Sequence, residues 1–98
     1  MGVSEISTKG LVFDYISGHF PVQSEGSIDR NPFCFRARGN RWSISVGRKS
    51  NGAPLWEYEE PYGAEPYAAG AMDTLEAREL VLMAAEKFRE YMMAHKSA

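Results

Sequence analysis

The segment FCFRARGNRWSISV, residues 33–46, constrains the fold more than any other, because two alternating runs flank Gly39-Asn40. Glycine and asparagine accept the positive φ angles of a two-residue hairpin turn. Folding the segment about this turn places every apolar residue on one face, in the pairs Phe33 with Val46, Phe35 with Ile44 and Ala37 with Trp42. A slip of one residue would mix the two faces. The segment therefore predicts an antiparallel hairpin.

A second turn follows at SNG, residues 50–52, where Gly52 suits the left-handed position of a three-residue loop. This loop would join strand 41–48 to strand 54–60, with Val46 opposite Trp56. Glu57 and Glu59 then lie on the face opposite the apolar one. A two-residue turn would instead set Val46 against Glu57, so the three-residue loop is preferred.

Residues 74–95 are predicted to form a helix, with Asp73 or Thr74 as N-cap and Glu76 completing a capping-box spacing. At about 100° per residue, one arc carries the apolar side chains that would cover the sheet: Ala77, Leu80, Val81, Ala84, Phe88, Tyr91 and Met92.

Leu75, Leu82 and Met93 fall on nearly the opposite side of this helix. Either the N-terminal segment GLVFDYISGHFPV or a second copy of the chain could cover them, which makes these three residues a candidate dimer contact. The pattern of the N-terminal segment fits both a helix and a strand. Residues 21–32, rich in proline, glycine and asparagine, are predicted to form a loop.

These elements predict an α+β fold, in which a three-stranded or four-stranded antiparallel meander packs against one long C-terminal helix. We expect a single domain over residues 1–98. Its parts would be the N-terminal segment and loop (1–31), the meander (32–60), a proline-tyrosine loop (61–73) and the helix (74–95).

The totals describe an ordinary globular chain of 98 residues, with 44% apolar and 24% charged residues. The net charge of −2 argues against bulk capture of nucleic acid. The single cysteine forms no internal disulfide, and neither a signal peptide nor a membrane span is recognisable. We therefore expect a cytoplasmic protein that does not contact membranes.

Charge is segregated along the chain. Residues 30–49 hold six cations and no acid, whereas residues 57–79 hold seven acids and one cation, Arg78. Ion pairs across the ladder could satisfy many of these charges. However, Arg38 faces Arg41 across the turn, and Glu59 is too far along its strand to pair with both. An anion on a partner would relieve this repulsion. The candidate interaction residues are Arg36, Arg38, Arg41, Arg48 and Lys49.

A second candidate surface lies in EEPYGAEPYAAGAMD, residues 59–73, which repeats a Glu-Pro-Tyr unit. Proline favours an extended path, and tyrosine is enriched at protein interfaces. Tyr62 and Tyr67 could therefore contact a partner. Alternatively, both rings could fold back and seal the core beside Trp56.

Catalytic machinery is not recognisable. His19 and His95 lie in no nucleophile or metal pattern, and no phosphate-binding glycine motif occurs. Cys34 lies near arginines that could lower its pKa, yet it has no placeable base partner. We expect no enzymatic activity, no cofactor and no metal.

The order of elements resembles the double-stranded RNA-binding domain, if the N-terminal segment is a helix. A three-stranded sheet followed by a helix that opens with DTLEAREL also resembles the arm-type DNA-binding domain of phage integrases, through Thr74, Glu76 and Ala77. Both likenesses concern topology over at most residues 32–94 and transfer no functional residue.

The sequence thus predicts a small non-catalytic module that binds another protein and acts as a regulatory or accessory factor, for example an inhibitor or a mobile-element protein. A homodimer is compatible with this expectation. The alternative function is binding of nucleic acid through an arginine-rich face of the sheet.

Overall fold

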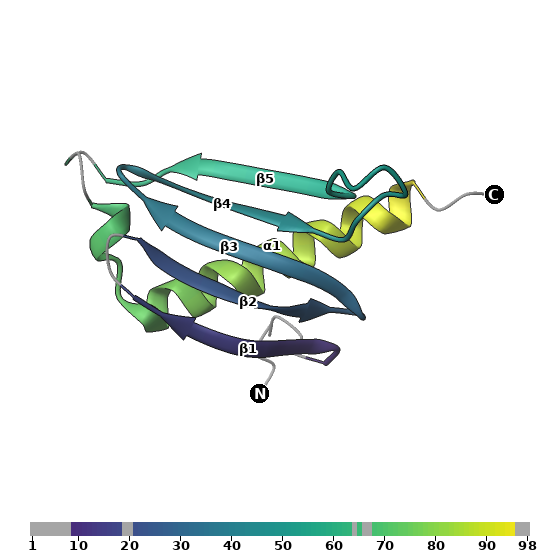
Figure 1. The fold of residues 1–98 in the computed structure, drawn as a ribbon, viewed down its shortest axis with the longest axis horizontal. Coiled ribbons are helices and arrows are strands. Elements are labelled where there is room, and N and C mark those ends of the chain that lie inside the picture. Colours follow the sequence, from purple (N-terminus) through teal and green to yellow (C-terminus); the bar gives the residue numbers. More distant parts are fainter. Residues whose placement is uncertain (1–8, 19–20, 64, 66–67, 96–98) are drawn as a thin grey trace, which may run out of the picture.

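The computed structural model describes residues 9–18, 21–63, 65 and 68–95. Its strands form one antiparallel meander in the order β1-β2-β3-β4-β5, and a single long helix follows them (Figure 1). The elements are β1 (Leu11–Ser17), β2 (Val22–Ile28), β3 (Asn31–Arg38), β4 (Arg41–Val46), β5 (Trp56–Pro61), a short 3-10 helix η1 (Ala69–Ala71) and α1 (Thr74–Ala94). The chain is therefore an α+β protein.

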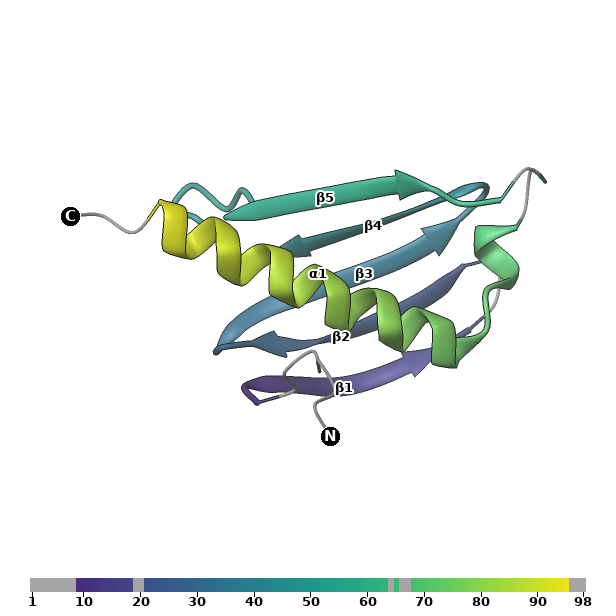
Figure 2. The ribbon, with the colours of Figure 1, turned by 180° about the vertical axis from the view of Figure 1, so that it is seen from behind.

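Helix α1 crosses one face of the sheet diagonally and leaves the other face open (Figure 2). Asp73 caps the helix, since its carboxylate accepts a hydrogen bond from the Leu75 amide at 2.7 Å. Its sheet-facing side buries Ala77, Val81, Ala84, Ala85 and Phe88. No described helix is long and apolar enough to cross a membrane.

The predicted hairpin is confirmed residue by residue. Phe33 pairs with Val46, Phe35 with Ile44, and Arg38 with Arg41. The register predicted for the second turn is confirmed, because Val46 pairs with Trp56, the Lys49 amide donates to the Ala53 carbonyl and Gly52 has a φ of 91°. The strands themselves are shorter than predicted, since β4 ends at Val46 and β5 starts at Trp56. These two turns fix which side chains of β3, β4 and β5 face the helix.

The predicted strand count was wrong, because the sheet has five strands rather than three or four. The N-terminal segment is a strand, and the stretch predicted to be a loop contains β2 and the start of β3. With no helix before the sheet, the likeness to the double-stranded RNA-binding domain does not hold, and five strands also depart from the three of the integrase domain.

The loop prediction failed because two buried positions of β2 carry serine and glycine, whereas buried strand positions are usually apolar. Ser24 is fully buried and donates to the Tyr15 carbonyl at 2.6 Å. A Cβ atom on Gly26 would lie 1.9 Å from the Val12 carbonyl oxygen. Strand β2 therefore alternates correctly, but two of its buried positions carry no apolar signal.

Arg89 connects the helix to the first two strands of the sheet. Its Nε donates to Asp29 Oδ2 at 2.9 Å, in the turn between β2 and β3. Its Nη2 donates to the Lys9 carbonyl at 2.6 Å. This contact thus links the C-terminal part of the helix to the β2–β3 turn and to the chain just before β1.

Candidate functional site

The open face of the sheet is the candidate site, because α1 covers only the other face (Figures 1 and 2). Side chains of a strand alternate between faces, and the register places one polar set on this side. It includes Tyr15, Gln23, Glu25, Cys34, Arg36, Arg38, Arg41, Ser43, Ser45, Glu57 and Glu59. The predicted interaction residues of β3 and β4 therefore point away from the core.

The β3–β4 turn presents three arginines that differ in their partners. Arg41 Nη1 lies 2.8 Å from Glu59 Oε2, and both side chains are more than half exposed. Arg36 and Arg38 are also exposed, and no carboxylate in the described ranges forms an ion pair with either. Glu59 therefore neutralises one arginine of this turn and leaves two available.

The turn itself is anchored to the chain that follows β5. The carbonyl of Gly39 accepts a hydrogen bond from the Ala69 amide at 2.9 Å. The carbonyl of Asn40 accepts one from the Tyr62 amide at 2.7 Å. Such bonds reduce the conformational entropy lost when a partner binds. We name the exposed pair Arg36 and Arg38 the arginine tip.

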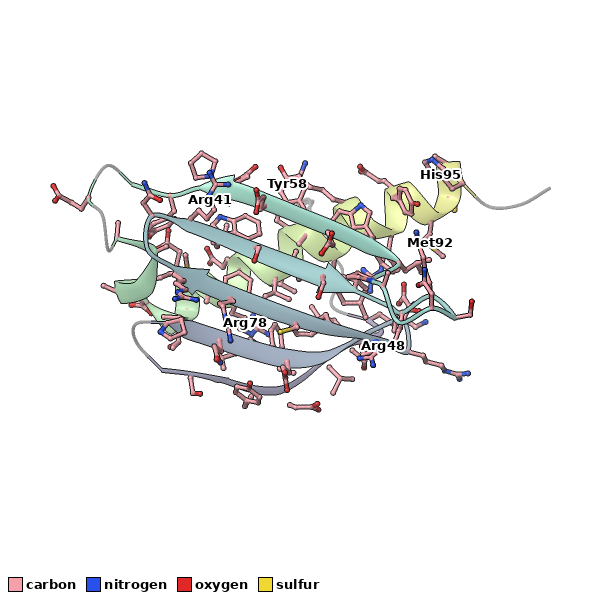
Figure 3. The ribbon with its side chains drawn as sticks, turned by 45° about the horizontal axis from the view of Figure 1, so that its top comes forward. Arg41, Arg48, Tyr58, Arg78, Met92 and His95 are labelled. Atoms are coloured by element: carbon pink, nitrogen blue, oxygen red, sulfur yellow. The ribbon has the colours of Figure 1, made fainter. Side chains whose placement is uncertain are left out.

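Arg48 and Lys49 follow the C-terminal end of β4, away from the arginine tip. Figure 3 shows Arg41 and Arg48 at opposite ends of β4. Strand β4 spans six residues, Arg41–Val46, or about 17 Å from its first to its last residue. The five predicted interaction cations therefore form two separate clusters. Glu57, on the neighbouring strand β5, pairs with Ser45 of β4.

A shallow depression of about 790 Å³ crosses the middle of the open face. Its polar lining consists of Cys34, Arg36, Ser43, Ser45, Glu57 and Glu59. Hydroxyl groups and both signs of charge thus meet on one surface. Within the described ranges, no group of three or more histidine, cysteine or acidic side chains could hold a metal ion.

Cys34 is an exposed thiol whose environment differs from the predicted one. Desolvation on the sheet face raises its pKa, and the carboxylate of Glu25 raises it further. Arg36 acts in the opposite direction but is outweighed. The expectation of a lowered pKa was therefore wrong, because desolvation, together with the acid that β2 places beside the thiol, outweighs the effect of Arg36.

Tyr62 is partly buried and packs against the core. Its hydroxyl donates to Glu76 Oε1 at 2.6 Å, and this hydrogen bond, together with burial, raises the pKa of Tyr62 to about 12. The ring thus connects the end of β5 to the first turn of α1. Tyr67 and His19 lie outside the described residues.

The candidate dimer residues do not form one patch. Leu75 and Met93 are 71% and 74% exposed, while Leu82 is only partly exposed. Eighteen helical residues separate Leu75 from Met93 by about 27 Å. His95, at the end of the helix, stacks on Tyr91 with 4.2 Å between ring centroids.

Sequence reasoning missed Tyr15 and Glu25 as members of the open face. Both lie on strands that it had left open or read as a loop. An alternation of Val22, Ser24, Gly26 and Ile28 was the available signal for β2.

No family model matches the chain, and no curated protein or solved structure matches it either.

Proposed function

We propose that the chain is a non-catalytic protein-binding module of regulatory or accessory type, which binds its partner through the arginine tip. The exposure of Arg36 and Arg38 without an ion-pair partner in the described chain is the observation that supports this function. An arginine fork binds a carboxylate or phosphate group with two parallel hydrogen bonds. The partner would therefore present acidic groups to the β3–β4 turn.

Mixed charge on the open face favours a protein partner over nucleic acid. Glu25, Glu57 and Glu59 lie on the same face as the arginine tip. A phosphate backbone would be repelled by these acids, whereas a protein can present both signs of charge. Tyr62 is a less suitable contact, because its hydroxyl already binds Glu76.

Two double variants of equal charge change test the proposal. Arg36→Glu with Arg38→Glu reverses the arginine tip, and Arg48→Glu with Lys49→Glu reverses the cluster at the other end of β4. Each variant and the wild type would be immobilised, and cell extract would be passed over them. We expect the first variant to lose a partner protein that the second retains. Equal retention by all three proteins would contradict the proposal.

Nucleic-acid binding is the second candidate function, and the same variants distinguish it. If both cation clusters contact phosphates, both double variants should weaken a gel shift with random duplex DNA or RNA. The affinity should also fall steeply with added salt. The protein-binding proposal expects no shift with either nucleic acid.

A homodimer through Leu75, Leu82 and Met93 remains a prediction that is separate from the arginine tip. Light scattering at two protein concentrations tests it, because a dimer would have twice the monomer mass of 11.0 kDa. Leu75→Glu with Met93→Glu should return such a dimer to the monomer mass.

A further inference from the structure

Strand β5 ends the sheet on one side, and within the described residues no strand pairs with its outer edge. Figure 1 shows this margin beside β4, with the helix running behind the sheet. Six consecutive residue pairs join β5 to β4 without a bulge, from Arg41 with Pro61 to Val46 with Trp56. The outer edge is therefore regular enough to template another strand.

The ladder determines which backbone groups face outward. The Tyr62 amide donates to the Asn40 carbonyl at 2.7 Å, so this residue pair is a hydrogen-bonded one. Hydrogen-bonded pairs alternate along an antiparallel ladder. The backbone N–H and C=O groups of Trp56, Tyr58 and Glu60 therefore point toward β4. The N–H and C=O groups of Glu57 and Glu59 therefore point away from the sheet.

The same two residues decide the chemistry of the edge. Glu57 and Glu59 are exposed, and their side chains lie on the open face, where Glu59 also pairs with Arg41 of β4. On the opposite face, Trp56 and Tyr58 are partly exposed and stack with 5.8 Å between ring centroids. An added strand would thus meet carboxylates on one side and aromatic rings on the other.

A second copy of β5 is a poor occupant of this edge. Antiparallel pairing of two such strands would oppose their glutamates, and like charges directly opposite each other are destabilising. Strand β1, the other margin of the sheet, has an irregular register between Phe13 and Tyr15 that interrupts its ladder. Charge complementarity therefore favours a basic segment as the added strand. The regular register of β5 makes its edge, and not that of β1, the better binding site.

We propose that the outer edge of β5 binds an extended basic segment of a partner protein as a sixth strand. Its lysine or arginine residues, two positions apart, would lie opposite Glu57 and Glu59. The residues between and beside them would be apolar and would contact Trp56 and Tyr58. Backbone hydrogen bonds supply affinity in this mode, and alternate side chains supply specificity. The surface is independent of the arginine tip.

A blocked synthetic peptide, Val-Lys-Val-Lys-Val, tests the proposal by titration into the ¹⁵N-labelled wild-type chain. We expect amide shifts centred on Glu57 and Glu59, together with slowed hydrogen exchange at these two amides. A Val-Glu-Val-Glu-Val peptide should bind more weakly. Methylation of alternate backbone nitrogens on the hydrogen-bonding edge of the lysine peptide should abolish binding, and this arm requires no protein variant.

A charge-reversal variant tests specificity. Glu57→Lys should weaken binding of the lysine peptide roughly fivefold and strengthen that of the glutamate peptide, because the cross-strand pair at this position changes sign. Glu79→Lys makes the same charge change on an exposed helix position and should leave both affinities unchanged. Arg36→Glu with Arg38→Glu should not abolish binding, which separates this edge from the arginine tip. Equal weakening by Glu57→Lys and Glu79→Lys, or shifts confined to other strands, would overturn the proposal.

Discussion

Arg38 lies directly opposite Arg41 across the β3–β4 turn, and of these two only Arg41 has a carboxylate partner in the described chain, Glu59 at 2.8 Å. One turn thus presents an arginine that forms an ion pair, Arg41, next to one that forms none with the described carboxylates, Arg38. The acid stands two residues from the end of β5, so it reaches one guanidinium and leaves Arg38 exposed. We infer that Arg38 is available to bind an anion on a partner.

Glu59→Gln should increase capture of the partner by the arginine tip. The substitution removes the carboxylate that neutralises Arg41, so that a third arginine becomes available to an acidic partner. Stability should change by less than about 1 kcal/mol, because both side chains are largely exposed. Pull-down yield and urea denaturation measure the two effects. Glu79→Gln, on the exposed side of the helix, is the matched control, and reduced capture by Glu59→Gln alone would contradict the expectation.

Tyr62→Phe should remove a pH-dependent part of the stability. The hydrogen bond to Glu76 raises the pKa of the folded-state phenol from 10.0 to about 12. The folded state therefore holds this proton more strongly than the unfolded state, and the resulting stability is present below pH 10 and is lost as the pH rises toward 12. The difference in free energy of unfolding between wild type and Tyr62→Phe should shrink over this range.

Tyr91→Phe provides the control for this titration, because the Tyr91 ring stacks on His95 near the other end of the helix. Urea denaturation at several alkaline pH values measures both variants. A constant difference between wild type and Tyr62→Phe from neutral pH to pH 12 would show that the hydroxyl does not donate to Glu76.

Gly26→Ala should destabilise the fold by about 3 kcal/mol, since overpacking a close contact forces the backbone to move. The added Cβ would lie 1.9 Å from the Val12 carbonyl oxygen and 2.9 Å from the Phe33 ring. Thermal denaturation followed by circular dichroism measures the loss. Gly52→Ala serves as comparison, because open space surrounds that position and only its positive φ of 91° opposes a side chain. We expect a cost there of about 1–2 kcal/mol.

Arg89→Gln should lower the free energy of unfolding by about 1–2 kcal/mol, because charged hydrogen bonds of a partly buried guanidinium are lost. Arg89 binds the Asp29 carboxylate and the Lys9 carbonyl, which lie 60 and 80 residues earlier in the chain. Amide exchange should rise mainly in β1 and in the β2–β3 turn. Unchanged exchange at these positions would show that Arg89 does not hold the first two strands against the helix.

The sequence predicted the parts of the fold that have short-range signals. The Gly39-Asn40 turn sets the pairing of Phe35 with Ile44, and Asp73 marks the start of the helix. These predictions succeeded because turn geometry and side-chain alternation act over a few residues.

The first two strands could not be recognised from the sequence, because contacts between residues distant in the chain determine which of their positions are buried. The irregular register between Phe13 and Tyr15 shifts the alternation of β1, so that no single period describes the segment. In β2, Ser24 is buried because it binds the Tyr15 carbonyl, and Gly26 because the backbone of β1 lies too close for a side chain. The pairing of Arg89 with Asp29 was equally invisible, because nothing local connects these residues.

The candidate site was predicted in part for the same reasons. The hairpin register correctly placed Arg36, Arg38 and Arg41 on one face, where the structure shows them exposed. It did not reveal that Glu25 lies next to Cys34, because β2 was predicted to be a loop.

Chemical footprinting of arginines tests the central claim most directly. The wild-type chain, free and bound to its captured partner, would be treated with phenylglyoxal, and each arginine would be quantified by mass spectrometry. We predict that the partner protects Arg36 and Arg38 and leaves Arg48 as reactive as in the free chain. Full reactivity of Arg36 and Arg38 in the complex would contradict the account.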